Sequence, residues 1–446
     1  MSASINLRTV KRQGVAAPKD PARGLAIAGD LSFTAAAETI ASRAEKVAAV
    51  AAQHAASVDN ESRFPAEALA AARAARLMSI AVPREFGGEG ASISDVADVC
   101  YALGRACAST AMIYAMHQTK VACLTRHGSG SAWHQRLLRR LCSEQMLLAS
   151  STTEGERGGD VRNSAAPIER SDARIALERC ATVISYGEAA DGIVTTARRS
   201  PEAASTDQVL VVFLKQDYTL ERQLGWDALG MRGTCSAGFK LIAAAASEQI
   251  LPVSYDQIHT RTMMPAAHLL WSGAWAGIAA TATDRARAFV RKARQRADGA
   301  LPPGAPHLTR ATASLQKLRG LVGGALPPGA PHLTRATASL QKLRALVAGA
   351  LRRFELAADD PVALDSIDFQ TAMNLHKVNA SELAVATVMS AMQACGIAGY
   401  RNDGEFSIGR HLRDILSSPV MISNDRILAN VAMASLLTGA PASLRD

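Results

Sequence analysis

The chain has few aromatic residues and lacks the cysteine motifs of a metal or disulfide protein. Phe, Trp and Tyr make up 4% of its 446 residues, and its 7 cysteines form no CxxC pair and no zinc-like spacing with histidine. Disulfide scaffolds and zinc sites both depend on such spacings. We therefore expect no metal and a reduced, cytoplasmic setting.

The chain also lacks a concentrated basic surface and a long apolar run. Its net charge is +9, but the cations are scattered, and no basic run is interleaved with aromatic residues. The most apolar stretch, residues 266–283, is shorter than a membrane span needs and runs into Asp284 and Arg285. We expect neither nucleic acid nor membrane as a partner, whereas a small anionic ligand would suit the charge.

The order of helical and strand patterns predicts an α+β fold that is mostly α. A basic N-terminal tail over residues 1–30 precedes Ala/Leu-rich amphipathic stretches over 31–148, which predict a helical domain. Short runs rich in Val and Ile then predict a compact β-barrel domain over 149–255. Long helical patterns return over 256–446 and predict a helical bundle.

One segment of the last part is duplicated almost without change. The sequence LPPGAPHLTRATASLQKLR occurs in both 299–323 and 324–348. Two near-identical copies indicate a tandem duplication rather than a solenoid, so only one copy should pack in the bundle. Copy one carries Gly320 and Gly323 where copy two has Ala345 and Ala348, and glycine weakens a helix. We expect 334–354 to form the packed helix.

Residues 152–160, Thr-Thr-Glu-Gly-Glu-Arg-Gly-Gly-Asp, combine two hydroxyls with three glycines where helices give way to strands. Hydroxyls and close backbone amides can bind the edge of a flat heteroaromatic ring, although a plain connecting loop has the same composition. About 30 residues later, alternation along a predicted strand points Val183 and Ser185 to one face. A ring could rest there.

Two further segments follow along the chain. The first is Leu229-Gly-Met-Arg-Gly-Thr-Cys-Ser236. The second is Gln393-Ala-Cys-Gly-Ile-Ala-Gly-Tyr400, which is followed by Arg413-Asp414 and by Ile422-Ser-Asn-Asp-Arg-Ile427. Together with Pro83 to Gly90, the set resembles the acyl-CoA dehydrogenase superfamily over about residues 35 to 435. The resemblance implies FAD, a helical domain, a middle β-barrel, a C-terminal four-helix bundle, and a homotetramer or dimer.

The resemblance also implies the cofactor contacts. The isoalloxazine would be surrounded by two groups of residues. One group is Ser150, Thr152, Thr153 and Gly159. The other is Val183, Ile184 and Ser185, which stand in place of the family's Trp-Ile-Thr. Gln393 and Gly396 would receive the adenosine end of a neighbouring subunit's FAD. Arg294 is the nearest substitute for an arginine that pairs with the pyrophosphate, and Asn424 is a further contact. FMN, or reduced flavin supplied by a reductase, is the alternative cofactor.

The family's catalytic glutamate is missing. Ile422 stands in its usual place and Ala267 in the place that some relatives use instead. His117 is the first candidate for the base, against the alternative of a hydrogen-bonded pocket histidine. Asp425 is the second, although it would also cap the helix that begins there. His411 is expected to be a solvated surface residue, and Glu154 to hold backbone amides in place.

Three functions follow from these observations. The first is α,β-dehydrogenation of an acyl thioester, carried by CoA or a carrier protein, with hydride transfer to flavin N5 and an electron-transfer flavoprotein or oxygen as acceptor. The second is a flavin-dependent monooxygenase of the same fold, which works through a flavin hydroperoxide and needs no α-proton base. The third is a catalytically silent flavoprotein.

Overall fold

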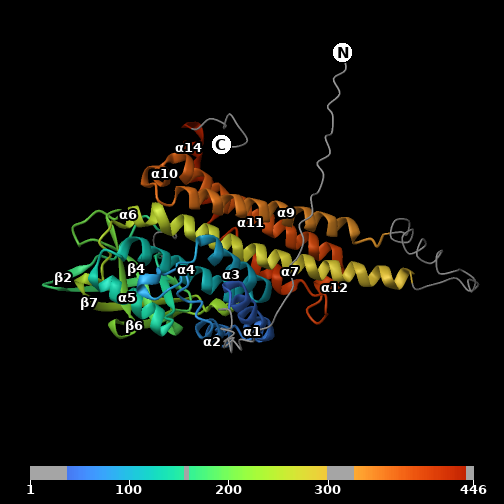
Figure 1. The fold of residues 1–446 in the computed structure, drawn as a ribbon, viewed down its shortest axis with the longest axis horizontal. Helices are drawn as coiled ribbons and strands as arrows, with labels where there is room; N and C mark the ends of the chain where they lie inside the picture. Colours follow the sequence, from blue (N-terminus) through green and yellow to red (C-terminus); the bar gives the residue numbers. More distant parts are fainter. Residues whose placement is uncertain (1–37, 155–159, 299–325, 438–446) are drawn as a thin grey trace, which may run out of the picture. The chain divides into compact units, whose positions relative to one another are not determined.

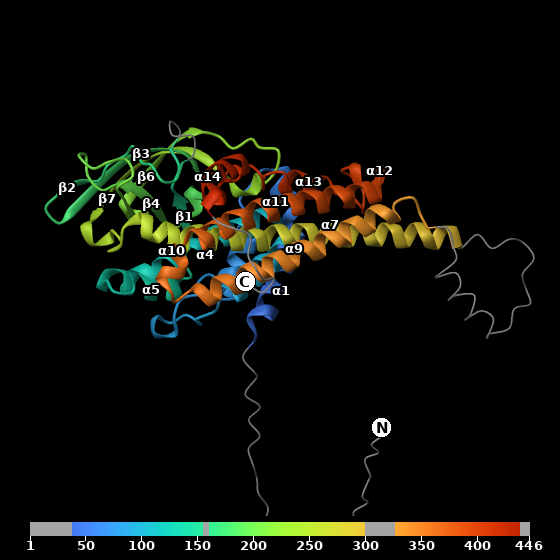
Figure 2. The same ribbon diagram turned by 90° about the horizontal axis from the view of Figure 1, so that it is seen from above.

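The computed structural model describes residues 38–154, 160–298 and 326–437. The described residues from Thr39 onward belong to one compact unit, shown in Figures 1 and 2. The helical, strand and helical parts follow one another in the expected order, which confirms the mostly α, α+β fold class. The basic tail over 1–30, the first copy of the duplicated segment and Gly159 lie outside the described residues.

Helices form the first part, and α4 lies at its centre. Helix α3 begins at Ser92, whose hydroxyl accepts from the Asp95 amide while the Asp95 carboxylate accepts from the Ser92 amide. Helix α4 is buried around most of its circumference because α3, α7 and strand β1 all pack on it. The helices are α1 (Ile40–Asn60), α2 (Ala66–Ala74), α3 (Ile93–Ala106), α4 (Ala108–Gly128) and α5 (Ala132–Glu144), with a short 3-10 turn, η1 (Arg84–Phe86).

The strands form two sheets rather than one closed barrel. A 3-stranded sheet has the order β1-β4-β5, with β1 parallel to β4, and a 4-stranded antiparallel sheet has the order β2-β3-β7-β6. The sheets contact each other through β1 with β3 and β5 with β7. The strands are β1 (Leu148–Ser151), β2 (Glu169–Ser171), β3 (Arg174–Ile184), β4 (Gly192–Arg198), β5 (Gln208–Leu214), β6 (Tyr218–Leu224) and β7 (Ala237–Ala246).

Three long helices, α7, α9 and α11, run side by side in the last part (Figures 1 and 2). Their bounds are α7 (Met264–Asp298), α9 (Ala330–Ala357) and α11 (Ile367–Cys395). A π-helical turn, η7 (His259–Met263), joins α6 (Tyr255–Ile258) to α7. The shorter helices are α10 (Pro361–Asp365), α12 (Ile397–Tyr400), α13 (Gly409–Ile415) and α14 (Asn424–Leu437), of which α13 and α14 pack on α11.

The second copy of the duplicated segment supplies α9. The expected packed stretch, 334–354, lies wholly within this helix and buries an apolar face with Leu343, Val347, Leu351 and Phe354. Ala345 and Ala348 lie on its exposed face. The prediction that the second copy forms a packed helix is confirmed.

Two glycines let α7 approach α3 closely. A Cβ atom on Gly273 would come within 2.9 Å of the Ala97 carbonyl oxygen, and one on Gly277 within 2.3 Å of the Tyr101 carbonyl oxygen. No Cβ atom fits at such distances from backbone, so glycine is required at both positions. This contact positions α7 against the helical part and thereby sets one wall of the cavity described next.

Candidate functional site

A cavity of about 830 Å³ lies where all three parts of the chain meet. Its walls come from α4, the ends of β1 and β3, the loop that leads into β7, the start of α7 and the segment from α13 to α14. Most of the wall is apolar, with methionines prominent. Volumes of this size, with a few convergent polar groups, are typical of small-molecule sites.

One wall of the cavity carries a group of hydroxyls that sequence analysis singled out. Ser150, Thr152, Thr153, Val183 and Ser185 all lie on it, and each is half-buried. Val183 and Ser185 thus share a wall, as predicted, but Thr182 lies on it too, because an irregularity between Ala181 and Ile184 interrupts the alternation of β3. Ile184 points the other way, into the core, and does not lie on the wall, so a side-chain contact of Ile184 with a bound ring is excluded.

A chain of hydroxyls fixes the orientation of the Ser185 side chain. Thr234 Oγ1 donates to the Met231 carbonyl oxygen at 2.8 Å, and Ser236 Oγ lies 2.7 Å from both Thr234 Oγ1 and Ser185 Oγ. Because each hydroxyl has a single proton, Ser236 must donate to Thr234 and Ser185 must donate to Ser236. Ser185 therefore presents an acceptor lone pair to the cavity.

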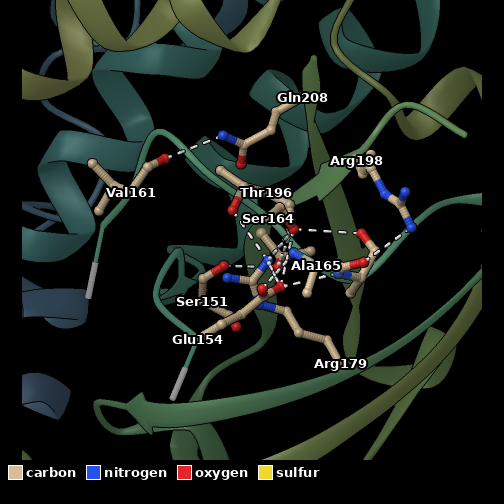
Figure 3. Close-up of polar contacts among 11 residues, drawn as sticks. Ser151, Glu154, Val161, Ser164, Ala165, Arg179, Thr196, Arg198 and Gln208 are labelled. Carbon is tan, nitrogen blue, oxygen red and sulfur yellow. Dashed lines mark hydrogen bonds and ion pairs between the residues drawn. The ribbon is translucent and has the colours of Figure 1, made fainter. Parts of the chain in front are cut away.

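Glu154 directly follows Thr153 of the hydroxyl-bearing wall, and Figure 3 shows the polar contacts of its side chain. Its carboxylate accepts from the Ser164 hydroxyl at 2.9 Å and from the Ala165 amide at 2.6 Å, and it pairs with Arg179 at 3.1 Å. Arg179 also donates to the Thr196 carbonyl oxygen on β4. The expectation that Glu154 holds backbone amides is confirmed, and its partner Arg179 was not foreseen.

The segment Leu229 to Ser236 forms a second wall and is held by α13. The Met231 amide donates to Asp414 Oδ1 at 2.7 Å. A Cβ atom on Gly230 would lie 2.2 Å from the Arg413 carbonyl oxygen, so the two segments touch through backbone. Burial raises the pKa of Asp414 to about 6, and Arg413 pairs with Asp59 at the end of α1.

Ile422 lies on the cavity wall, in a strained backbone conformation. Its φ is +52°, a left-handed value that β-branched residues rarely adopt. The buried Lys377 on α11 holds this turn by donating to the Ile422 carbonyl oxygen at 2.5 Å and to Asn424 Oδ1 at 2.8 Å. Burial lowers the pKa of Lys377 to about 8. Strain that is retained by such contacts is a feature of functional segments.

His117 is a structural residue and not a cavity residue. It is fully buried, its Nδ1 accepts from the Leu148 amide at 3.0 Å, and its Nε2 lies 2.7 Å from the Met78 carbonyl oxygen. Nδ1 is thus unprotonated and Nε2 donates. Burial lowers the pKa of His117 to about 4. Both nitrogens are occupied by backbone, so we withdraw His117 as a catalytic candidate in favour of the alternative, a hydrogen-bonded core histidine.

The remaining candidates near Ile422 also face away from the cavity. Asp425 is exposed in the first turn of α14, where the helix dipole stabilises a carboxylate. Asn424 is buried, and its amide nitrogen donates to Ser381 Oγ on α11 at 3.0 Å. His411 was expected at the surface but is buried on α13, where burial and two neighbouring arginines hold its pKa well below the usual value.

The residues predicted for the adenosine end of FAD lie on helices of the bundle. Gln393 is exposed near the end of α11, Gly396 follows it with a φ of +55°, and Arg294 lies near the end of α7. Figures 1 and 2 both show α12, which follows directly, on the side of the bundle away from the strands. The two predicted halves of the cofactor site therefore do not meet within one chain.

Lys120 on α4 is the functional candidate that sequence reasoning missed. It lines the cavity, is 4% exposed, and lies 3.1 Å through its Nζ from Met263 Sδ. Burial lowers its pKa to about 8. The signal was the one lysine of this helix, four and eight residues after Met116 and Met112 and on the same helical face.

The wall chemistry fits a flavin ring. Four hydroxyls can meet the polar edge of an isoalloxazine, and the methionine-rich opposite side can cover its apolar part. The described part of the chain holds no cluster of three His, Cys, Asp or Glu side chains that could bind a metal ion. Among the described helices, none has the length and apolar character needed to cross a membrane.

A second cavity, of about 530 Å³, adjoins the first and is basic. Arg232, Arg285, Arg410 and Arg413 line it, and Asp59 is the one carboxylate among its described lining residues. Arg413, Ala228 and Leu229 border both cavities. The apolar cavity therefore opens beside a concentration of guanidinium groups, which bind phosphates and carboxylates well.

Comparison with known proteins connects both ends of the chain to one family. Residues 34–145 match the acyl-CoA dehydrogenase N-terminal domain, and residues 327–437 match the acyl-CoA dehydrogenase C-terminal domain.

Individual relatives agree with these matches. A probable acyl-CoA dehydrogenase of Mycobacterium leprae is 37% identical over 122 residues, or 27% of this chain and 30% of that one. A cyclohex-1-ene-1-carbonyl-CoA dehydrogenase of Geobacter metallireducens is 29% identical over 181 residues, or 40% and 47% of the two chains. The matches thus span less than half the length of these curated relatives.

A solved structure shares the fold over most of the chain. FMN-bound TdsC, a dibenzothiophene monooxygenase of Paenibacillus sp. A11-2, superposes with a TM-score of 0.74 at 16% identity, covering 90% of this chain and 98% of that one. At this identity the likeness concerns fold alone. Together with the two domain matches and the sequence relatives, it leads to one conclusion: the chain belongs to the acyl-CoA dehydrogenase superfamily.

Proposed function

We propose that the protein is a flavin-dependent oxidoreductase that dehydrogenates an acyl thioester between its α and β carbons. The observation that carries the proposal is the convergence of Ser150, Thr152, Thr153, Val183 and Ser185 on the wall of one large cavity, where a flavin ring would lie. A bound flavin would accept the hydride from the β carbon, and the α-proton would pass to the neutral imidazole of His259, which lies on the cavity wall. The chain itself would supply hydrogen bonds to the ring and an apolar enclosure that excludes water. The strained segment at Ile422 would form part of that enclosure.

The basic cavity supports a phosphate-bearing substrate. A CoA or carrier-protein arm carries phosphates, and the four arginines of the second cavity could bind them while the acyl group enters the apolar cavity. The sequence relatives whose names refer to CoA substrates point in the same direction.

The proposal includes FAD as the cofactor, with a homotetramer or dimer in the cytoplasm as the working form. Gln393, Gly396 and Arg294 lie apart from the hydroxyl-bearing wall, which is the arrangement expected if they serve the FAD of a neighbouring subunit. FMN is the alternative, because the ring contacts alone would hold either flavin. An electron-transfer flavoprotein or oxygen would then reoxidise it.

A second candidate, monooxygenation, is favoured by the absence of a wall carboxylate. Among the described residues that line the main cavity, none is an aspartate or glutamate, and both family positions for the base, Ile422 and Ala267, lie on its wall. His259 also lines it, but burial lowers its pKa to about 3. A monooxygenase needs no α-proton acceptor, whereas a dehydrogenase does.

Anaerobic mixing tests the proposal and separates the candidates. The flavin-loaded protein is mixed with straight-chain acyl-CoAs in the absence of oxygen, and the visible flavin absorption is followed. Dehydrogenation predicts bleaching by at least one acyl-CoA. No bleaching with any of them, together with substrate-dependent oxygen consumption when a flavin reductase is supplied, would establish the monooxygenase instead. A protein that retains no flavin would contradict both.

A further inference from the structure

Lys120 is a buried cation without a carboxylate partner. Of the described residues, only Met263 contributes a polar atom to its ammonium, and a thioether is a weak acceptor. An ion in such surroundings is costly unless it is paired or faces a ligand. Because Lys120 lies on the cavity wall, its missing partner can come from a molecule in the cavity.

Lys120 and the turn that carries Arg232 of the basic cavity lie near different ends of α4. The 3-10 turn η5 (Arg232–Thr234) lies at the start of α4, where the Gly233 amide donates to Ser109 Oγ at 3.2 Å. The contact of Lys120 with Met263 lies near the other end of α4, where α7 begins. Along α4, eight residues separate Met112 from Lys120, a rise of about 12 Å.

The wall between these two ends is apolar. Met112 and Met116 on α4 face the cavity, as do Met264, Ala267 and Trp271 on α7. An aliphatic chain would fit this stretch, with its phosphate-bearing end at the arginines and its other end at Lys120. A neutral chain end would leave the ammonium without a partner, whereas a carboxylate would satisfy it.

We propose that Lys120 determines specificity by binding a carboxylate at the far end of the substrate, so that the substrate class is an acyl thioester ending in a second acidic group. The thioester part of this inference rests on the proposed function, whereas the carboxylate part rests on the cavity alone. With its pKa at about 8, Lys120 carries a proton at neutral pH, and a bound carboxylate stabilises that charged form.

Two probes of equal chain length separate charge recognition from apolar binding. Octanoate and octanamide are titrated into the full-length protein at pH 7, followed by calorimetry and by the fluorescence of the cavity residues Trp226 and Trp271. We expect octanoate to bind at least about tenfold more tightly than octanamide, the range of a charge-assisted hydrogen bond. Lys120→Met should remove this difference and leave octanamide binding within about twofold.

Controls separate this inference from folding and from flavin binding. Lys342→Met removes an exposed lysine on α9 and should leave both affinities unchanged, while Lys120→Arg should keep the preference for octanoate. A melting temperature of Lys120→Met at or above that of the parent protein would show that the fold is intact, because a buried charge has been removed.

Equal binding of octanoate and octanamide to the parent protein would overturn the inference, and so would an undiminished octanoate preference in Lys120→Met. A third contradicting result is that Lys120→Met loses affinity for FAD and FMN but keeps its affinity for octanoate. The last result would assign Lys120 to the flavin. Because neither probe undergoes redox chemistry, a preference that depends on Lys120 would stand even if no acyl-CoA reduced the flavin.

Discussion

Glu154 Oε1 and Arg179 Nη1 lie 3.1 Å apart, in an ion pair whose side chains are 6% and 0% exposed. The pair joins the segment after β1, which carries Thr152 and Thr153, to the middle of β3 and to β4 (Figure 3). Removal of one partner leaves the other charge buried and unpaired, which costs more than the pair itself contributes. The cavity wall thus depends on an ion pair that does not itself line the cavity.

Glu154→Gln should therefore lower the free energy of unfolding by about 3–5 kcal/mol. It should also weaken flavin binding, because Thr152 and Thr153 lose their support. Urea unfolding followed by circular dichroism measures the first effect, and flavin titration the second. Glu248→Gln, which breaks the exposed pair with Arg136 at 3.3 Å, serves as the control and should cost less than about 1 kcal/mol. Equal effects of the two substitutions would refute the structural role of Glu154.

His117→Leu should destabilise the fold but leave the cavity chemistry intact. The Leu148 amide would lose the His117 acceptor, and the Met78 carbonyl oxygen would keep only the Gln118 side chain as a donor, at a cost of about 2–4 kcal/mol. The folded pKa of about 4 lies below the ordinary 6.5, so between these values the unfolded chain binds the proton that the folded chain does not. The stability that His117 contributes is therefore present above pH 6.5 and lost toward pH 4.

Urea unfolding of the parent and His117→Leu proteins at several pH values measures this effect. The difference in their free energies of unfolding should shrink by up to about 3 kcal/mol between pH 6.5 and 4. Flavin affinity per folded molecule should not change. A variant of normal stability that has lost turnover would instead restore His117 as a catalytic residue.

Ser236→Ala should lower the reduction potential of the bound flavin. The hydroxyl chain makes Ser185 an acceptor toward the cavity, and loss of Ser236 frees the Ser185 proton to donate there. A donor favours the oxidised flavin, whose N5 accepts, over the reduced flavin, whose N5 carries hydrogen. One net hydrogen bond corresponds to about 10–30 mV for a two-electron couple.

Spectroelectrochemical titration of the flavin measures this shift, with the exposed Ser143→Ala as a control. Thr234→Val should act in the same direction as Ser236→Ala, because it removes the acceptor that orients Ser236. An unchanged or raised potential in both variants would show that Ser185 does not contact N5.

Two deletions of equal length test the duplicated segment. Removal of residues 301–325 keeps the second copy, which forms α9 and its packed face, and should therefore leave the melting temperature almost unchanged. Removal of residues 326–350 leaves the first copy to form the helix, with glycines in place of Ala345 and Ala348. These glycines should cost about 2 kcal/mol. Equal stability of the two proteins would contradict this account of α9.

The sequence predicts the fold class and much of the cavity wall because both depend on local patterns. Strand alternation predicts Val183 and Ser185 on one face, and both line the cavity, although an irregularity before Ile184 brings Thr182 there too. The fate of the titratable residues was harder to foresee. The ring nitrogens of His117 hydrogen-bond to backbone groups 31 and 39 residues away. The Lys120 ammonium contacts Met263, 143 residues away.

The same limit explains the remaining differences. His411 lies among charged residues in the sequence, which suggests exposure, but α13 packs on α11, α7 and α4, and His411 is buried there. The two sheets replace a closed barrel because β1 pairs with β4 in parallel while β3 pairs with β7, and neither pairing is visible in strand patterns alone.

Flavin titration tests the central claim most directly. The full-length protein and its Ser185→Ala and Thr153→Val variants are titrated with FAD and with FMN, and the flavin spectrum and the quenching of tryptophan fluorescence are recorded. We expect one flavin per chain and an affinity about tenfold weaker in each variant, since each loses a ring contact. Failure of the protein to bind either flavin, or variants that bind as tightly as the parent, would contradict the placement of the ring in this cavity.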